Sequence, residues 1–375
     1  MTKEVYRVED FDRKNIGSLF SNLKDGELLS VWSPIEVRLL AEISPVTVKR
    51  INESTGFKYE ISSKNLEEQA KTLAGFLMLS IDNSIFKGTM QSTMVKSKVR
   101  NLEILYEAIG EECPISKEDV TDDNFIDFAY VTKKLALSIA KRYQRDFAET
   151  HRLEPQNHLR FVSFFADLFG NNLERVIQYG SSVKGDGKEK DIDLMLLLNK
   201  INRRTYDLIN GKREYVPSEK PVGIVLLPSD GLSAYTECNY HCLTIAREGR
   251  LVYGEAIDFP VLSEEDSIRK MYFKAGKELT SLRNALGDKN RQEALAQRPE
   301  FLRDTLKLEI WIRKALLQQE LGKYLSKDEF LELEPVPIID LGNSPSISEV
   351  RSALYDANCR VKKRIEQYFS VKTGN

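Results

Sequence analysis

The sequence lacks long apolar runs and has few cysteines. No run of about 18 apolar residues occurs, and the charged N-terminal segment has no apolar signal-peptide core. We therefore expect a cytoplasmic protein that does not enter the membrane. Four scattered cysteines in 375 residues do not suggest a disulfide framework. These are Cys113, Cys238, Cys242 and Cys359.

The sequence also lacks an excess of charge of one sign. Charged residues make up 30% of the chain, yet the formal net charge is only −2. Binding to nucleic acid would therefore need a local basic patch rather than a general attraction. With 41% apolar residues, the chain is long enough for two or three domains, each with its own core.

The most informative stretch predicts a strand, a glycine-serine turn and a second strand. Val176–Tyr179 is β-branched and aromatic, as is typical of a strand. Gly180 permits a tight turn and the close approach of a ligand. Ser181 and Ser182 can cap a short helix, whose free N–H groups form a phosphate site. A polar loop then leads to an apolar strand over residues 191–198.

Asp191 and Asp193 carry the predicted chemistry. Side chains two residues apart on a strand share a face, about 7 Å apart. Two carboxylates so placed can bind hard divalent cations, and a pair of ions about 3.5–4 Å apart can promote in-line phosphoryl transfer. The alternative is a solvated strand end that carries two aspartates by chance. The apolar run that follows disfavours it, because burying two like charges is costly unless something pairs them.

This stretch resembles the Gly-Ser…Asp-x-Asp signature of the DNA polymerase β nucleotidyltransferase superfamily, and most closely its small prokaryotic members. The matching residues are Gly180, Ser181, Lys184 (where the family has arginine), Gly185, Asp191 and Asp193. The string Arg-Glu-Gly-Arg-Leu-Val-Tyr-Gly at residues 247–254 resembles the end of the same core.

The resemblance implies an α+β fold in which helical regions flank a nucleotidyltransferase core with a mixed β-sheet. It implies Mg²⁺ (or Mn²⁺) at Asp191 and Asp193. It also implies that a nucleoside triphosphate is held by Gly180, Ser181, Ser182 and Lys184.

The third carboxylate of the superfamily is missing from its expected position. Residues 221–228 predict a buried strand, and Gly223 stands where the family has an acid. A carboxylate there would complete the ligand set and could take a proton from the acceptor. Glu219, Asp230 and Glu237 are candidate replacements. Two carboxylates together with substrate phosphates, or a loss of catalysis, are the alternatives.

The N-terminal region suggests a small helical module. Ser33, Pro34 and Glu36 predict a capped helix start, and further helices and a strand over residues 57–61 follow. This order resembles a helix-turn-helix module. Such a module would place Thr47, Lys49 and Arg50 on a DNA-recognition helix. A scaffold or partner-binding role is the alternative.

Cys238, His241 and Cys242 are close enough in sequence to suggest a metal site. A structural zinc site needs four protein ligands, and no second cluster supplies the fourth. Buried cysteines on a helix over residues 237–246 are the simpler interpretation.

The C-terminal region predicts amphipathic helices over residues 263–286, 299–321 and 346–369. Lys270, Lys274 and Lys277 form a basic stripe on the first of them. By resemblance to larger superfamily members, Lys274 is a candidate contact to the triphosphate. A solvated helix face is the alternative.

We therefore expect a mainly helical region over residues 1–150, a nucleotidyltransferase core over 155–258 and a helical domain over 259–375. The expected reaction is transfer of a nucleoside monophosphate from a triphosphate to a hydroxyl, with release of pyrophosphate. The favoured acceptor is a nucleotide or nucleic acid, including signal-oligonucleotide synthesis in prokaryotic antiviral defence.

Two other functions remain open. One is a toxin or resistance enzyme that modifies a protein, transfer RNA or small molecule. The other is a DNA-binding or scaffold protein with an inactive core. A homo-oligomer or a partner protein is compatible with each of these.

Overall fold

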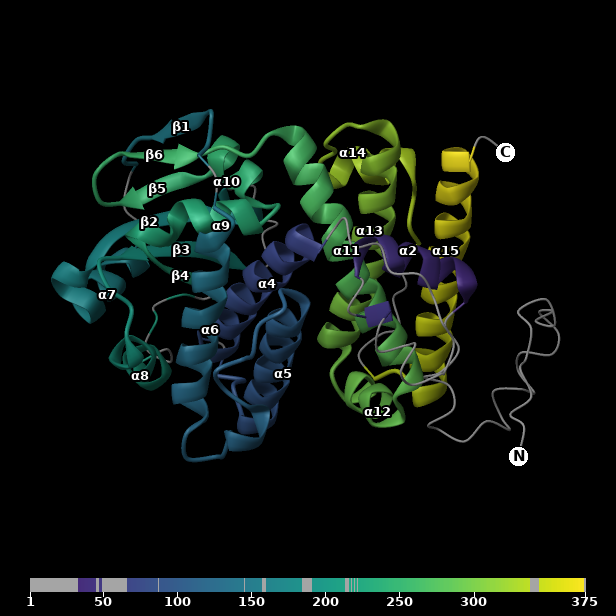
Figure 1. Cartoon of the computed structure of the whole chain (residues 1–375), viewed down its shortest axis with the longest axis horizontal. Helices are drawn as coiled ribbons and strands as arrows, with labels where there is room; N and C mark the ends of the chain where they lie inside the picture. Colours follow the sequence, from purple (N-terminus) through teal and green to yellow (C-terminus); the bar gives the residue numbers. More distant parts are fainter. Residues whose placement is uncertain are drawn as a thin grey trace. The chain divides into compact units, whose positions relative to one another are not determined.

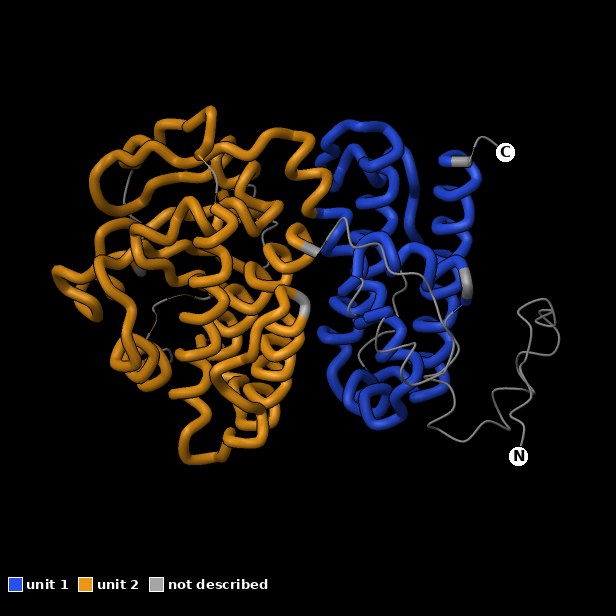
Figure 2. The backbone as a smooth tube through the Cα atoms, viewed as in Figure 1, with its two compact units in different colours: residues 1–65, 271–375 blue, residues 66–270 orange. Residues whose placement is uncertain are grey.

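The computed structural model describes residues 33–44, 47–48, 66–86, 88–144, 146–156, 160–183, 191–212, 216, 218, 220, 222–337 and 344–373 (Figure 1). The chain forms two compact units (Figure 2). The first, here called the sheet unit, spans Leu66–Lys270, and the second, the helical unit, combines the N-terminal segment with Met271–Asn375. The expected α+β composition is confirmed. The division expected near residues 150–155 does not coincide with this one, because the helices before it belong to the sheet unit.

A four-stranded mixed sheet lies in the sheet unit, with strand order β4-β3-β2-β5. Strand β3 pairs antiparallel with β2 and parallel with β4, and β2 pairs antiparallel with β5. A separate antiparallel pair, β1–β6, was not expected from the sequence. The strands are β1 (Thr150–Leu153), β2 (Leu173–Tyr179), β3 (Ile192–Leu198), β4 (Val222–Pro228), β5 (Arg250–Tyr253) and β6 (Ile257–Pro260).

Helices cover both faces of this sheet. The α-helices that lie wholly in the described part of the sheet unit are α4 (Leu66–Phe86), α5 (Ser92–Ala108), α6 (Phe125–Arg142), α7 (Arg160–Phe169), α8 (Arg203–Lys212), α9 (Leu232–Cys238) and α10 (Cys242–Glu248). The single helix predicted over residues 237–246 is wrong, because α9 ends at Cys238 and α10 begins at Cys242. Asn239 explains the break: its backbone is extended, and its side-chain amide donates to the Tyr235 carbonyl at 2.9 Å. Asparagine makes such bonds readily and so favours helix ends.

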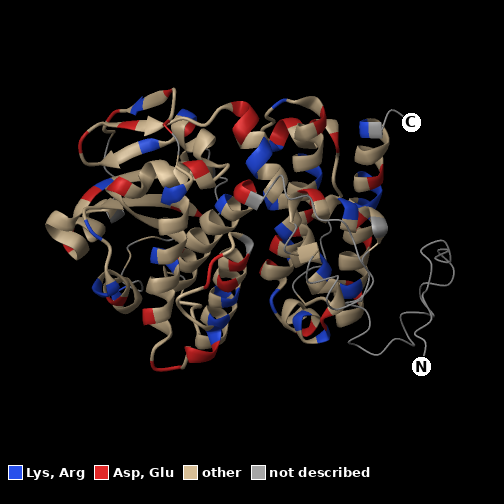
Figure 3. Ribbon diagram, viewed as in Figure 1, with Lys and Arg blue, Asp and Glu red and all other residues tan. Residues whose placement is uncertain are grey.

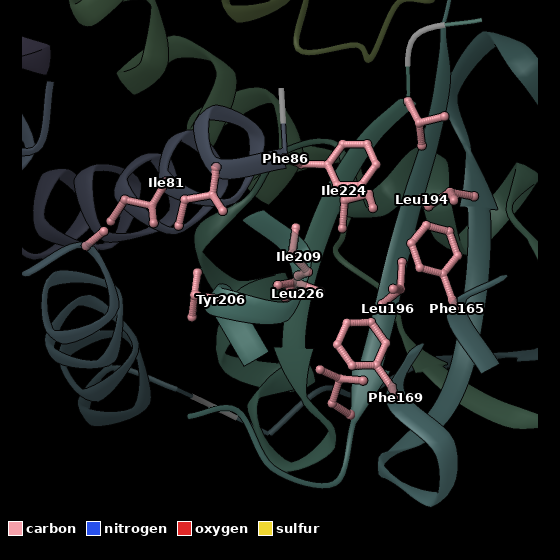
Figure 4. Close-up of a cluster of buried hydrophobic side chains, with 14 of the residues drawn as sticks. Ile81, Phe86, Phe165, Phe169, Leu194, Leu196, Tyr206, Ile209, Ile224 and Leu226 are labelled. Carbon is pink, nitrogen blue, oxygen red and sulfur yellow. The ribbon is translucent and has the colours of Figure 1, made fainter. Parts of the chain in front are cut away.

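Alternation along the strands gives the sheet two buried faces. One face packs on α4, α7 and α8 through a large apolar cluster. Figure 4 shows Phe165 and Phe169 of α7 beside Leu194 and Leu196 of β3. The intervening residues of β3, Met195 and Leu197, are also fully buried. Helices α9 and α10 contact β4 and β2.

The helical unit contains α2 (Pro34–Ile43), the C-terminal part of α11 (Glu264–Gly287), α12 (Lys289–Gln297), α13 (Pro299–Leu321), α14 (Lys327–Leu333) and α15 (Ile347–Thr373). The helices predicted over 263–286, 299–321 and 346–369 are confirmed to within a few residues, whereas α12 and α14 were not expected. The predicted start of α2 is confirmed, since the Ser33 N–H donates to the Glu36 carboxylate at 3.0 Å. The strand predicted over 57–61 lies outside the described residues, as do Lys49 and Arg50 of the predicted recognition helix.

Charged residues are spread over both units. Figure 3 shows acidic and basic residues intermingled along the helices. No helix in the described part of the chain combines the length and the apolar character needed to cross a membrane.

Candidate functional site

Three strands bring Gly180, Asp193 and Gly223 together at one end of the sheet, here called the Asp193 end. Asp193 pairs with Tyr179 of β2 on one side and with Gly223 of β4 on the other. Gly180 directly follows Tyr179 and has a φ of +75°, in the left-handed region that favours glycine. The turn predicted at Gly180 therefore lies beside the predicted metal-binding aspartate.

The Asp193 carboxylate lies against both glycines. A Cβ atom at position 180 would lie 2.7 Å from its Oδ2, and a Cβ atom at position 223 would lie 2.7 Å from its Oδ1. Glycine at both positions gives the carboxylate room over the neighbouring strands. The missing acid at position 223 thus has a physical reason: Asp193 itself occupies the space that a side chain there would enter.

Asp191 lies in the bend just before β3 and is exposed, while Asp193 is partly buried. Both residues therefore lie at the same end of the sheet, and the shared face that their spacing predicts remains a prediction. Of the predicted metal-binding pair, Asp193 lies closer to the protein core and Asp191 is the more exposed.

An aromatic cluster adjoins Asp193. The Tyr179 ring stacks on His241 with the ring centroids 5.9 Å apart, and the Tyr235 hydroxyl lies 3.0 Å from His241 Nε2. Burial, together with the negative charge of Asp193, raises the pKa of the Tyr179 phenol well above its ordinary value. This hydroxyl therefore stays protonated at neutral pH.

The aromatic cluster also accounts for His241 without a metal. Among the described residues, no group of three or more histidine, cysteine, aspartate or glutamate side chains is arranged to hold an ion. Cys238 and Cys242 are buried. Burial raises the pKa of the Cys238 thiol to about 12, so it is neutral.

The turn after β2 is a short 3₁₀ helix, Gly180–Val183, which contains both serines that were expected to cap a helix; residues 184–190, where that helix would run, lie outside the described residues. The Ser182 hydroxyl donates to the Tyr179 carbonyl at 3.1 Å and accepts from the Gln178 amide at 3.1 Å. Ser182 therefore fixes the shape of the turn. The predicted contacts of Gly180, Ser181 and Ser182 with a triphosphate remain predictions, and Lys184 lies outside the described residues.

The candidate replacements for the third carboxylate differ in position. Because β3 and β4 are parallel and Leu198 pairs with Pro228, Asp230 follows the opposite end of the sheet from Asp193. There it forms an ion pair with Lys141 at 2.7 Å. Glu219 lies outside the described residues.

Glu237 is fully buried, and its carboxylate binds two ammonium groups. These belong to Lys71 and Lys270, at 3.1 and 3.4 Å. The solvated face considered for the basic stripe is therefore wrong for Lys270, which is buried in this ion-pair cluster. Lys274 lies in the other compact unit and pairs with Glu278 at 3.3 Å. Its contact with a triphosphate remains a prediction.

Two residues of α4 beside strand β4 were missed by the sequence analysis. Asp82 accepts hydrogen bonds from Lys133 at 2.6 Å, from Tyr206 at 3.1 Å and from the Leu226 N–H at 2.8 Å. Lys133 also donates to the Leu226 carbonyl. The Asn83 Oδ1 accepts from the Ile224 N–H at 3.2 Å. The only sign in the sequence is a polar pair within the apolar part of a helix.

These contacts cover the outer edge of β4, the terminal strand of the sheet. An edge strand presents unpaired N–H and C=O groups, which proteins commonly cover or block. Burial raises the pKa of Asp82 and lowers the pKa of Lys133. The charge of each group acts against the burial shift of its partner's pKa. The pair is stabilised by its close contact and by the extra donors to Asp82.

Comparison of the chain with protein-family models, with curated proteins and with solved structures found no match in any of the three.

Proposed function

We propose that this chain is a metal-dependent nucleotidyltransferase. It would transfer a nucleoside or deoxynucleoside monophosphate from a triphosphate to a hydroxyl group and release pyrophosphate. The observation that carries the proposal is the position of the Asp193 carboxylate between Gly180 and Gly223, with Asp191 two residues before it.

The donor atoms at the Asp193 end suit Mg²⁺ or Mn²⁺. Both ions prefer carboxylate oxygens, and Mg²⁺ usually keeps several waters and binds one or two protein carboxylates together with substrate phosphates. Asp191 and Asp193 would hold the ion. When bound, it would supply positive charge to the triphosphate and to the departing pyrophosphate.

The chain's own groups would position the substrate. Gly180 has no side chain and a positive φ, so a phosphate oxygen can approach the backbone of the turn closely. Ser182 and Gln178 hold that turn in one conformation. The protonated Tyr179 hydroxyl is a hydrogen-bond donor in the same region, and as a neutral group it adds no charge that would repel a phosphate.

The large helical regions on either side of the core resemble those of enzymes that act on nucleotides or oligonucleotides. They favour a nucleotide or nucleic-acid acceptor, including the synthesis of a signal oligonucleotide. An enzyme of this type needs no added acceptor, because one nucleotide supplies the hydroxyl that attacks the next. A transferase that modifies a protein, transfer RNA or small molecule would need its acceptor to be present.

The test is incubation of the purified chain with each of the four ribonucleoside and four deoxyribonucleoside triphosphates, with Mg²⁺ or Mn²⁺. Pyrophosphate is followed, and the products are resolved by mass. The Asp191→Ala/Asp193→Ala double variant is the negative control, and Asp230→Ala is the matched control from the opposite end of the sheet. We expect the wild type and Asp230→Ala to release pyrophosphate from at least one triphosphate, and the double variant to release none. The proposal would be contradicted if the wild type released no pyrophosphate from any of the eight triphosphates and also bound none of them.

A further inference from the structure

An amide oxygen of α4 lies beside the Asp193 carboxylate. A Cβ atom at position 223 would lie 3.4 Å from Asn83 Oδ1 and 2.7 Å from Asp193 Oδ1. The two oxygens therefore approach the same point above Gly223, one from a helix and one from the neighbouring strand. The residue that lacks a side chain is what leaves room for both.

The position of Asn83 is fixed by its neighbours. The adjacent Asp82 binds Lys133, Tyr206 and the backbone of β4, which anchors α4 against the strand. Asn83 itself accepts from the Ile224 N–H at 3.2 Å, next to Gly223 in the chain. Its side chain is only partly buried, whereas Asp82 is fully buried. Asn83 is therefore held at the strand edge and is not fully enclosed by the protein.

The chemistry of the amide oxygen suits a divalent cation. A carbonyl oxygen has two lone pairs, and the Ile224 N–H uses one of them. Side-chain amide oxygens are among the ligands of hard cations. Adjacent ligands of a six-coordinate Mg²⁺ lie about 3 Å apart, because each is about 2.1 Å from the ion. Asn83 Oδ1 and Asp193 Oδ1 lie 3.4 and 2.7 Å from one point above Gly223.

We propose that Asn83 supplies a third protein oxygen to the ion held by Asp191 and Asp193, in the place of the carboxylate that position 223 does not carry. This inference rests on the proposed function. A neutral third ligand leaves the site with two negative charges rather than three. The free protein should then bind the ion weakly, and the triphosphate oxygens should complete its coordination.

The test is a titration with Mn²⁺ alone, followed by electron paramagnetic resonance of the free ion, on the full chain. Asn83→Asp keeps an acceptor for the Ile224 N–H and adds a carboxylate, so we expect binding about tenfold tighter than in the wild type. Asn83→Leu removes the oxygen, and we expect binding several-fold weaker. Thermal unfolding of each variant checks that the fold is retained.

Asn172→Asp is the matched control. The Asn172 side-chain oxygen also accepts a backbone N–H, that of Lys200 at 2.9 Å, but it lies at the opposite end of the sheet. This variant adds the same charge and should leave Mn²⁺ affinity unchanged.

Wild-type affinity in a folded Asn83→Asp variant would overturn the inference and leave the aspartate pair intact as an ion site. A tightening of the same size in Asn172→Asp would also overturn it, because the effect would then be one of net charge. Failure of the wild type to bind Mn²⁺ more tightly than Asp191→Ala/Asp193→Ala would contradict both this inference and the proposed ion site.

Discussion

The two ends of the central sheet carry aspartates in very different surroundings. At one end the Asp193 carboxylate lies between two glycines, beside a turn with a left-handed residue. At the other, the exposed Asp230 pairs with Lys141 at 2.7 Å. Both are acids next to strands of the same sheet, so residue type does not separate them. The backbone around them does, because glycines flank the Asp193 carboxylate on both neighbouring strands, whereas Asp230 is held by an exposed ion pair.

A second contrast lies along α6, which supplies both lysines that pair with aspartates near β4. Lys133 binds Asp82 at 2.6 Å with side chains 4% and 0% exposed, and Lys141 binds Asp230 at 2.7 Å with side chains 37% and 75% exposed. The distances are nearly equal, so burial decides the energetic weight of each pair. Water screens the exposed pair, whereas removal of one buried partner leaves an uncompensated charge.

The largest expected effect separates the two ends of the sheet. Asp193→Asn should lower nucleotidyl transfer about 10³-fold, because the loss of a metal ligand removes several kcal/mol of charge stabilisation. Asp230→Asn should retain wild-type transfer. Initial rates of pyrophosphate release at saturating triphosphate measure both. Equal losses in the two variants would show that the Asp193 end has no special role.

The next effect concerns stability rather than activity. Asp82→Ala should lower the free energy of unfolding of the sheet unit by about 3–5 kcal/mol, because Lys133 would remain buried without its partner. Asp230→Ala, which breaks the exposed pair on the same helix, should cost less than about 1 kcal/mol. Urea denaturation followed by circular dichroism measures both. A cost below about 1 kcal/mol for Asp82→Ala would mean that the buried pair does not anchor α4.

Gly180→Ala should have a smaller effect on stability and a specific effect on function. A positive φ costs an alanine about 1–2 kcal/mol, and the new Cβ atom would also displace the Asp193 carboxylate. Gly110→Ala is the control, since Gly110 has a φ of +77° with nothing within 4 Å of an added Cβ atom. Both variants should lose similar stability, but only Gly180→Ala should lose Mn²⁺ binding and transfer. Full transfer in Gly180→Ala would contradict the role given to this turn.

The last prediction is that zinc makes no contribution to stability. Treatment with a zinc chelator should leave the melting temperature unchanged. Cys238 and Cys242 are buried, and His241 packs in the aromatic cluster, so none of the three needs a metal to hold its position. At pH 8, Cys359 should react rapidly with a thiol reagent, whereas the buried Cys238 and Cys242 should react only on unfolding. Burial raises the pKa of Cys238 to about 12, so little reactive thiolate is present at that pH. Stoichiometric zinc that is lost on Cys238→Ser would contradict this interpretation.

Local patterns predicted much of the fold. The capping box at Ser33 and Glu36, the apolar runs of β2, β3 and β4 and the long C-terminal helices all follow from spacing and end signals within a few residues. The Asp-x-Asp spacing likewise placed Asp191 and Asp193 at one strand end. These features depend on neighbours in the chain, which the sequence displays directly.

The features that were missed depend on contacts between distant residues. Asp82 and Asn83 meet β4 more than a hundred residues later, so no local pattern shows that they cover its edge. The short pair β1–β6 joins segments equally far apart. Asp230 and Glu237 looked equivalent in sequence, and only the strand direction and the lysines around Glu237 separate them.

The most direct measurement is a crystal structure of the chain with Mn²⁺ and a non-hydrolysable triphosphate, with the ion located by its anomalous signal. We predict an anomalous peak about 2.1–2.2 Å from carboxylate oxygens of Asp191 and Asp193, with a phosphate oxygen in the same coordination shell. An ordered triphosphate whose ion makes no contact with either aspartate would contradict the proposed site.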